Sequence, residues 1–487
     1  MLKKYLSSVV VPAILAVLFL SPQLGRPLWF DEALTILNFV MTPHLADVYW
    51  NYAIPNNHIL FSLLLRLEAE GLWAMGLGVP ELAWRAVSLL SAAIALTVMY
   101  RVWTRRCGRL STLFVLIGFI GAPAFAIYAT AVRGYMLGFL TVLLAFEAGR
   151  RFMTGRRIYL FWYALAALAA VGTIPSDLLA LGAAALLLVP RQWRDRNWRR
   201  WALLVAVPPL MFLVFYGPLW PQLLHHIALK EGWPNGGRAM LLVYVGFVLP
   251  MLPLLWLAAG GGRLAWRRGA PPRTVGAILV MLGPLLAVPL LHPYPFPRTF
   301  FVWWPLWLYL TAAGLHRLGL WMSWSKWDFR AEERGRKAGF VIIGLILLSF
   351  AAVLYLPTRN CGSIISGGEL DDYFRPYYIV TDRDRDREYH PDQTVRLARE
   401  QAADGWIYAS FAADPYPLLY YGLLQNMPAD QWRFDGPRGR VASLDGCRLV
   451  VLRYDEKPDE VAAKLGVKKL HPVAANGYHR LYRPTAD

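Results

Sequence analysis

Long apolar segments separated by short polar gaps dominate the first 356 residues. A helix that crosses the hydrocarbon core of a bilayer needs about 20 apolar residues. The segments that reach this length within a few residues are 5–22, 83–102, 110–128, 134–149, 158–175, 177–190, 201–218, 239–260, 274–292, 299–317 and 338–356. The pattern therefore predicts an α-helical polytopic membrane protein with about eleven transmembrane helices.

The gap between the first two of these segments, residues 23–82, is unusually long. Within it, residues 58–78 are apolar, but three charged side chains lie in their middle, where a bilayer makes charge costly. Polar residues there recur at every fourth position and so share one face of a helix: His58, Ser62, Arg66 and Glu70. We interpret 58–78 as an interfacial helix within a long first outer loop. Long ordered loops usually carry function.

The composition becomes polar after Pro357. Trp406–Phe411 and Arg448–Tyr454 have the alternation and residue types of strands, and Gln393–Ala402 has helical spacing. The sequence thus predicts two parts. Residues 1–356 form a transmembrane domain, and residues 357–487 form a soluble extracytoplasmic α/β domain.

The charge distribution supports this topology. The chain is 57% hydrophobic with a mean hydropathy of +0.37, yet its formal net charge is +18. The basic residues before residue 357 concentrate in every second gap, which is the positive-inside pattern. The basicity therefore reports orientation rather than a nucleic-acid partner. The N-terminus is predicted to be cytoplasmic, with 5–21 as an uncleaved signal anchor, and the short loops favour a bacterial inner membrane.

The three cysteines do not form the spacing of a metal cluster. Cys107 falls in a basic gap, on the predicted cytoplasmic side. Cys361 and Cys447 both lie in the C-terminal region, where an oxidising compartment would permit a disulfide. Spacing alone leaves that pairing open.

An acidic pair, Asp31 and Glu32, opens the long outer loop. Apolar residues follow at helical spacing, so the pair occupies the first turn of a short helix beside the membrane. Capping that helix is one explanation. Alternatively, the flanking Trp29 and Phe30 desolvate a carboxylate, which raises its basicity and suits a general base.

The run Leu28–Ala33 resembles the acidic-pair motif of the GT-C glycosyltransferases, which include protein O-mannosyltransferases and lipid A aminoarabinose transferases. Further segments resemble that superfamily in the same order: Asn57-His58 without the usual prolines, Arg85 with the span behind it, Tyr128–Tyr135, and Pro297–Phe301 followed by Pro305. The similarity covers most of 1–320. It implies a GT-C-like fold and a polyprenyl-phosphate sugar as donor, with no nucleic acid as partner.

The resemblance also implies roles for single residues. Cations near the departing lipid phosphate favour the transition state, and arginine matches phosphate oxygens. The expected phosphate-binding residues are Arg133, Arg298, His58, Arg85 and Tyr135. Without the resemblance, arginines at the ends of spans would be explained by contact with lipid head groups.

A divalent metal ion is a second expectation, for which Asp31 and Asp177 are the candidate ligands. Hard cations need several oxygen ligands. Some relatives have a second aspartate where this chain has Tyr135, and this departure weakens the metal hypothesis. Asp177 would supply the missing carboxylate, although a turn cap is the simpler explanation for it.

The function predicted from these features is inverting transfer of a sugar to an acceptor on the outer face, with Asp31 as base and Glu32 beside it. The acceptor stays open among proteins, lipids and cell-envelope glycans. A lipid transporter or flippase is the alternative; it would require charges within spans and two related halves. An outer binding module on a membrane anchor would not require so many spans.

Overall fold

The structure is a computed structural model that describes residues 20, 24–52, 57–190, 197–229, 271–287, 297–324, 389–402, 405–434 and 444–485. The predicted spans 239–260 and 338–356, nearly all of 5–22, and Cys361 lie outside these residues. The chain divides into two compact units. The helical unit comprises Met1–Leu24 and Val48–Thr381, and the sheet unit comprises Gly25–Asp47 and Asp382–Asp487.

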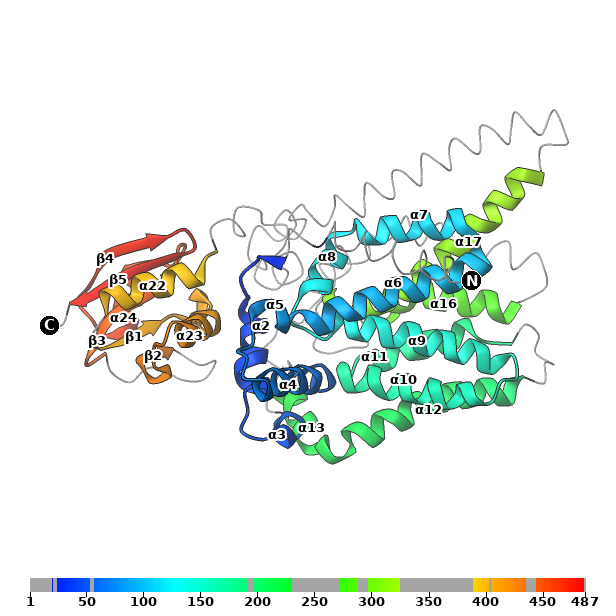
Figure 1. Cartoon of the computed structure of the whole chain (residues 1–487), viewed down its shortest axis with the longest axis horizontal. Helices are drawn as coiled ribbons and strands as arrows, with labels where there is room; N and C mark the ends of the chain where they lie inside the picture. Colours follow the sequence, from blue (N-terminus) through cyan, green and yellow to red (C-terminus); the bar gives the residue numbers. More distant parts are fainter. Residues whose placement is uncertain are drawn as a thin grey trace. The chain divides into compact units, whose positions relative to one another are not determined.

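Every predicted span that falls on described residues of the helical unit is helical in the structure (Figure 1). The first outer loop carries α3 (Leu45–Trp50), α4 (Ile59–Ala74) and α5 (Glu81–Trp84). The helices that follow are α6 (Ala86–Cys107), α7 (Arg109–Ile120), α8 (Pro123–Thr130), α9 (Tyr135–Met153), α10 (Ile158–Thr173), α11 (Asp177–Leu187), α12 (Trp198–Tyr216), α13 (Trp220–Leu229), α16 (Pro271–Ala287), η6 (Pro297–Trp303) and α17 (Trp304–Trp324).

Length and apolar composition identify candidate membrane spans among these helices. In the described part of the chain, Ala86–Cys107 and Trp198–His225 pass on their own, and the bent pair Arg109–Ile120 with Ala124–Thr130 would make a third. Shorter apolar helices among the described residues include Ile158–Thr173 and Asp177–Leu187. The helical architecture is therefore confirmed, whereas the count of eleven spans stays a prediction.

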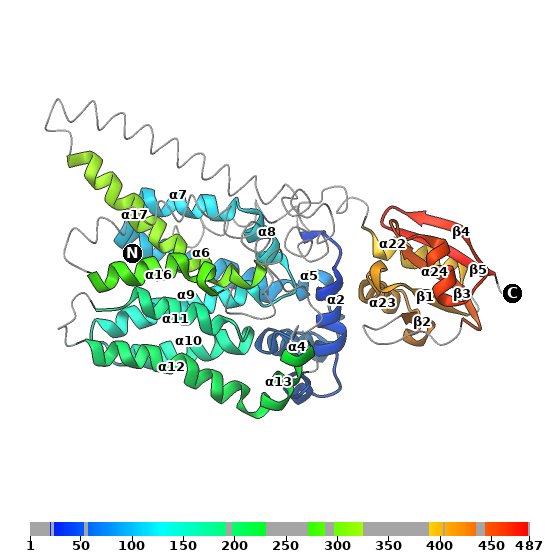
Figure 2. The ribbon, with the colours of Figure 1, turned by 180° about the vertical axis from the view of Figure 1, so that it is seen from behind.

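Helix α9 lies at the centre of the helical unit. It packs against α6, α10 and α11, and these helices run side by side in Figure 1; the view from behind shows α16 next to α11 (Figure 2). Most of its side chains are buried on every face, which is the pattern of a central helix rather than of an amphipathic one. Its N-terminal end is therefore fixed from several sides.

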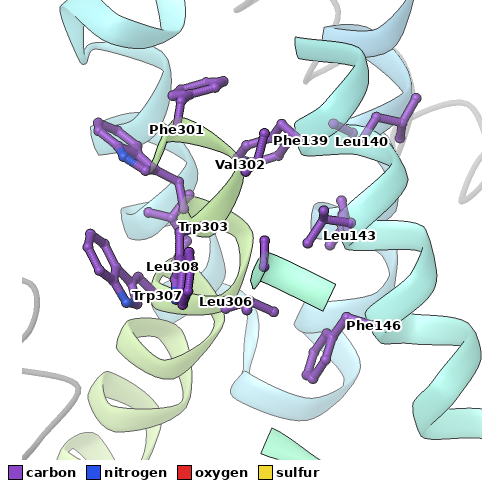
Figure 3. Close-up of a cluster of buried hydrophobic side chains, with 14 of the residues drawn as sticks. Phe139, Leu140, Leu143, Phe146, Phe301, Val302, Trp303, Leu306, Trp307 and Leu308 are labelled. Carbon is purple, nitrogen blue, oxygen red and sulfur yellow. The ribbon is translucent and has the colours of Figure 1, made fainter. Parts of the chain in front are cut away.

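Aromatic packing fixes the segment η6 against α9 (Figure 3). The ring of Phe139 stacks on Phe119 at 4.9 Å and lies 5.4 Å from Phe301. The indole nitrogens of Trp303 and Trp307 both donate to the carbonyl of Val280 on α16, at 3.1 and 3.0 Å. Such contacts place Arg298, at the start of η6, near the N-terminal end of α9.

The sheet unit contains a five-stranded mixed sheet in the order β2-β1-β3-β5-β4. Its strands are β1 (Trp406–Ala409), β2 (Trp432–Phe434), β3 (Cys447–Arg453), β4 (Lys469–Asn476) and β5 (His479–Thr485), and its helices include α22 (Pro391–Gln401), α23 (Pro415–Leu424) and α24 (Pro458–Leu465). The α/β prediction is confirmed, as are both predicted strands and the predicted helix. Cys447 is a free, buried thiol that donates to the carbonyl of Leu449.

The segment Gly25–Asp47 belongs to the sheet unit, although more than three hundred residues separate it in the sequence from the rest of that unit. It carries α2 (Phe30–Thr35) and η1, a single π-helical turn at Ile36–Val40. Helix α2 packs against α23. The backbone N–H of Leu28 donates to the hydroxyl of Tyr421 at 3.0 Å, and the ring of Phe30 meets Tyr416 edge-on at 5.0 Å. The acidic pair is thus held by the C-terminal sheet unit.

Candidate functional site

Four residues predicted from the sequence come together at the N-terminal end of α9 in the helical unit. His58, Arg133, Tyr135 and Arg298 are all buried, with Arg133 only 1% exposed and Arg298 only 8%. We call these four residues the cationic cluster. Two guanidinium groups and an imidazole gather positive charge and N–H donors in one buried place, so the cluster is a candidate anion site.

The start of α4 positions His58. The side chain of Asn57 donates to the carbonyl of Val48 at 3.1 Å and accepts from the hydroxyl of Ser62 at 2.9 Å. These bonds tie the first turn of α4 to the preceding loop. His58 and Ser62, the first two of the four polar residues that share one face of this helix, are therefore buried within the unit. Farther along the same face, Glu70 pairs with Arg66 at 2.9 Å.

Arg133 lies in the turn between α8 and α9, and Arg85 braces that turn. The Arg85 guanidinium donates to the carbonyl of Thr130 at 2.6 Å and pairs with Glu81 at 3.2 Å. The hydroxyl of Ser88 donates to the carbonyl of Ala131 at 2.6 Å. The structure therefore brings Arg85 beside the cluster, where its bonds hold the backbone that carries Arg133.

The hydrogen bonds of His58 determine which hydrogens face the cluster. The backbone N–H of Gly134 donates to Nδ1 at 2.8 Å, so the hydrogen of a neutral ring resides on Nε2. Nε2 lies 3.3 Å from Nη2 of Arg133. Both nitrogens are then donors and cannot bond to each other. An oxygen placed beside both can accept from each.

The charge of the cluster follows from its burial. Desolvation lowers the pKa of His58 well below the usual 6.5, and the charges of Arg133 and Arg298 lower it further. The ring is therefore neutral near pH 7, and the positive charge resides on the arginines. Tyr135 packs edge-on against His58 at 5.0 Å and lies 5.8 Å from the Arg133 guanidinium, so it restricts both side chains.

The two acids of the pair have different environments in the sheet unit. Both are buried, with Glu32 at 0% exposure and Asp31 at 9%. The Glu32 carboxylate accepts from the backbone N–H of Trp29 at 3.1 Å and so caps α2. The predicted first-turn position is confirmed. Glu32 therefore stabilises the start of the helix.

Asp177 is the first residue of α11 and is fully buried. The turn-cap explanation is wrong, because neither carboxyl oxygen has a hydrogen-bond partner among the described residues. Its carboxyl group rests on Gly138: a Cβ at that glycine would stand 2.6 Å from Oδ2 of Asp177. The described residues also contain no group of three His, Cys, Asp or Glu side chains able to hold a metal ion. They therefore do not fit the predicted metal, and no reaction step is assigned to one.

Sequence reasoning missed two glycines that make this arrangement possible. A Cβ on Gly134 would stand 2.8 Å from Nδ1 of His58, and a Cβ on Gly138 would collide with Asp177. The glycines are four residues apart and face the same side of α9. Their spacing was visible in the sequence, but the side chains that approach them come from distant segments.

Comparison with solved structures places this arrangement among known folds. The crystal structure of ArnT from Cupriavidus metallidurans in the apo state superposes with a TM-score of 0.55, covering 98% of this chain and 97% of that chain at 16% identity. ArnT bound to undecaprenyl phosphate gives a TM-score of 0.53 with the same coverage and identity. ArnT is a lipid A aminoarabinose transferase of the GT-C class. The chain has the GT-C fold.

A third structure, arabinofuranosyltransferase AftD from Mycobacteria solved by cryo-EM, matches 100% of this chain and 40% of that chain at 16% identity. Its TM-score of 0.49 is too low to add to the fold assignment. No protein-family model matches the sequence, and comparison with curated proteins finds no match. The resemblance to GT-C proteins is thus confirmed at the level of the fold.

Proposed function

We propose that this protein is a membrane glycosyltransferase that takes a sugar from a polyprenyl phosphate and transfers it to an acceptor on the outer face. The observation that carries the proposal is the convergence of the His58 ring and the Arg133 guanidinium as two donors beside a second buried arginine. This chemistry suits a phosphate. It occurs in a chain with the fold of ArnT, which has been solved with undecaprenyl phosphate bound.

The cluster would act on the leaving group. When the bond between the anomeric carbon and the phosphate oxygen breaks, its electron pair stays on the phosphate, whose negative charge grows. Arg133 and Arg298 neutralise that charge, and neutral His58 donates a further hydrogen bond. Because Tyr135 and Gly134 hold these groups in place, little reorganisation is needed during the reaction.

Asp31 is the proposed general base. It takes the proton from an acceptor hydroxyl or amine, and the freed lone pair forms the new bond to the anomeric carbon from the side opposite the phosphate. The product is inverted. Glu32 caps α2, so Asp31 is the member of the pair assigned to the proton.

Acceptor identity is left at the level of a hydroxyl- or amine-bearing protein, lipid or glycan of the cell envelope. A flippase for the same lipid is the second candidate, since the cationic cluster would bind the phosphate in either case. The two differ in what they do with the sugar: a transferase releases polyprenyl phosphate, whereas a flippase returns its cargo unchanged.

Asp31→Asn separates these functions. Purified protein is incubated with undecaprenyl phosphate sugars and an extract of cell-envelope acceptors, and released undecaprenyl phosphate is measured. We expect Asp31→Asn to lose at least about a hundredfold in turnover, as expected for removal of a general base, while lipid binding is retained. Asp47→Asn changes a partly exposed acid of the same unit, which accepts from the His44 amide; this variant is the control and should keep full turnover.

A matched pair of arginine variants tests the phosphate site. Arg133→Ala should weaken binding of undecaprenyl phosphate itself by about tenfold or more, because a buried charge-assisted bond is lost. Arg151→Ala, at the other end of α9, should not change that binding. Full turnover in Asp31→Asn would remove Asp31 from the mechanism, and unchanged lipid binding in Arg133→Ala would remove the phosphate site.

A further inference from the structure

Two fully buried side chains of the helical unit end in polar groups that have no role in the proposed phosphate site. They are Asp177, at the start of α11, and Tyr216, the last residue of α12, each 0% exposed. Neither the Asp177 carboxyl oxygens nor the Tyr216 hydroxyl has a hydrogen-bond partner among the described residues. Burial of such groups without a partner is costly, so a fold that retains two of them calls for another explanation.

The two groups belong to one location. Helices α11 and α12 are in contact. Asp177 begins α11 and Tyr216 ends α12, and these two consecutive helices run in opposite directions, so both residues lie at the same end of the pair. Among the described residues, apolar and aromatic side chains lie next to them. Val302 lies beside the Asp177 carboxyl group over Gly138, and the ring of Tyr52, from the first outer loop, meets the ring of Tyr216 edge-on at 5.8 Å.

This location adjoins the cationic cluster along α9. The His58 ring lies over Gly134 and the Asp177 carboxyl group lies over Gly138. The two glycines are four residues apart on one helix face, which corresponds to a separation of about 6 Å along the axis. A sugar ring joined directly to a phosphate is of this size. A ligand whose phosphate lies at His58 and Arg133 would therefore carry its sugar toward Asp177.

The chemistry of the pair fits ring hydroxyls. A carboxyl group has two oxygens that can hydrogen-bond to two neighbouring hydroxyls, and a phenol can both donate and accept. Aromatic and aliphatic neighbours suit the C–H faces of a sugar. A simple cation would need more oxygen ligands than Asp177 supplies, and an apolar chain would leave both polar groups unsatisfied.

We propose that Asp177 and Tyr216 form the subsite that binds the sugar of the donor, with the carboxyl group hydrogen-bonding to neighbouring hydroxyls of the ring. This inference rests on the proposed function, because it assumes that the phosphate occupies the cationic cluster. It assigns Asp177 to sugar recognition and Tyr216 to the same task. The phosphate site supplies affinity for any polyprenyl phosphate, and this subsite selects the sugar.

Binding measurements on the purified full-length protein separate the two sites. The probes are undecaprenyl phosphate and the same lipid carrying glucose, mannose, galactose or arabinose. For the wild type, we expect at least one sugar-linked lipid to bind about tenfold tighter than the plain lipid. Asp177→Asn and Tyr216→Phe should each lose most of that advantage and bind plain undecaprenyl phosphate like the wild type.

Two controls exclude a general packing effect. Tyr163→Phe removes a buried hydroxyl whose bond to the carbonyl of Leu204, at 2.7 Å, lies in the same helix bundle; it should retain the sugar advantage. Asp177→Asn should not lower the thermal stability of the protein without ligand, because the carboxyl group has no hydrogen bond to lose among the residues that the structure describes. A marked loss of stability would assign Asp177 a structural role instead.

Each remaining outcome has one meaning. If Asp177→Asn keeps the sugar advantage, or if no sugar-linked lipid binds the wild type tighter than the plain lipid, the subsite is disproved while the phosphate site stands. If the wild type does not bind plain undecaprenyl phosphate at all, the phosphate site fails and the subsite with it. A defect confined to the KM of the acceptor would overturn the assignment to the donor.

Discussion

His58 accepts a hydrogen bond from a backbone amide and lies near two arginine charges, and these surroundings determine its own charge. Burial and the charges of Arg133 and Arg298 lower its pKa well below 6.5, and the bond from Gly134 requires an unprotonated Nδ1. As pH falls below 6.5, His58 is protonated in the unfolded chain but stays neutral in the folded protein. Folded-state stability is therefore complete above the ordinary pKa and decreases as pH falls toward the lowered one.

We expect the folding stability of the wild type to decrease with falling pH more steeply than that of His58→Gln. The stability advantage of the wild type should shrink by up to about 1.4 kcal/mol per pH unit between pH 6.5 and 5.5. Thermal unfolding midpoints at pH 7.5, 6.5 and 5.5 measure it. His44→Gln, outside the cluster, should follow the wild type. Parallel pH profiles for wild type and His58→Gln would contradict the neutral, buried state.

Helix α2 is the element whose position decides whether Asp31 can act, and its support comes from α23. Tyr421 accepts the buried N–H of Leu28, one residue before the N-cap of α2. Tyr421→Phe leaves that N–H without this acceptor, which costs about 1–3 kcal/mol. We expect turnover to fall about tenfold with little change in binding of undecaprenyl phosphate. Tyr454→Phe, a more exposed tyrosine of the same unit, is the control, and an equal loss in both variants would refute a specific role for Tyr421.

Sequence patterns predicted elements better than they predicted contacts. Hydrophobic periodicity identified α9 and α10, and apolar runs identified β1 and β3, because each signal is local. Strand β4 was missed: it is partly exposed and contains Pro472, so it has no continuous apolar run. The association of α2 with α23 was also missed, since nothing near Phe30 in the sequence specifies a partner almost four hundred residues away.

The same limit applies to the candidate site. His58, Arg133, Tyr135 and Arg298 were predicted from ordered motifs, and the structure brings them together. Capping was one of the two explanations for the acidic pair, and Glu32 has that role through a bond to a backbone N–H three residues earlier. The motifs did not contain the burial of Asp177 without a hydrogen-bond partner among the described residues, because burial depends on the tertiary environment.

At the scale of the whole molecule, the membrane topology of the sheet unit determines on which side Asp31 lies. The segment carrying Asp31 belongs to the sheet unit, so whichever side of the membrane the C-terminal sheet faces is also the side of the proposed base. The positive-inside pattern predicts the outer side for that unit and the cytoplasmic side for the basic turn between α9 and α10. Transfer on the outer face therefore requires the sheet unit to be outside.

Cysteine accessibility tests this requirement in intact cells. Ala463→Cys lies on the exposed face of α24, and Thr154→Cys lies in the exposed turn after α9. In a background with Cys361 replaced by serine, since Cys107 and Cys447 are buried, an impermeant maleimide should label Ala463→Cys directly. Thr154→Cys should react only after permeabilisation. The reverse result would place Asp31 on the cytoplasmic side, because α2 belongs to the sheet unit. It would contradict transfer on the outer face.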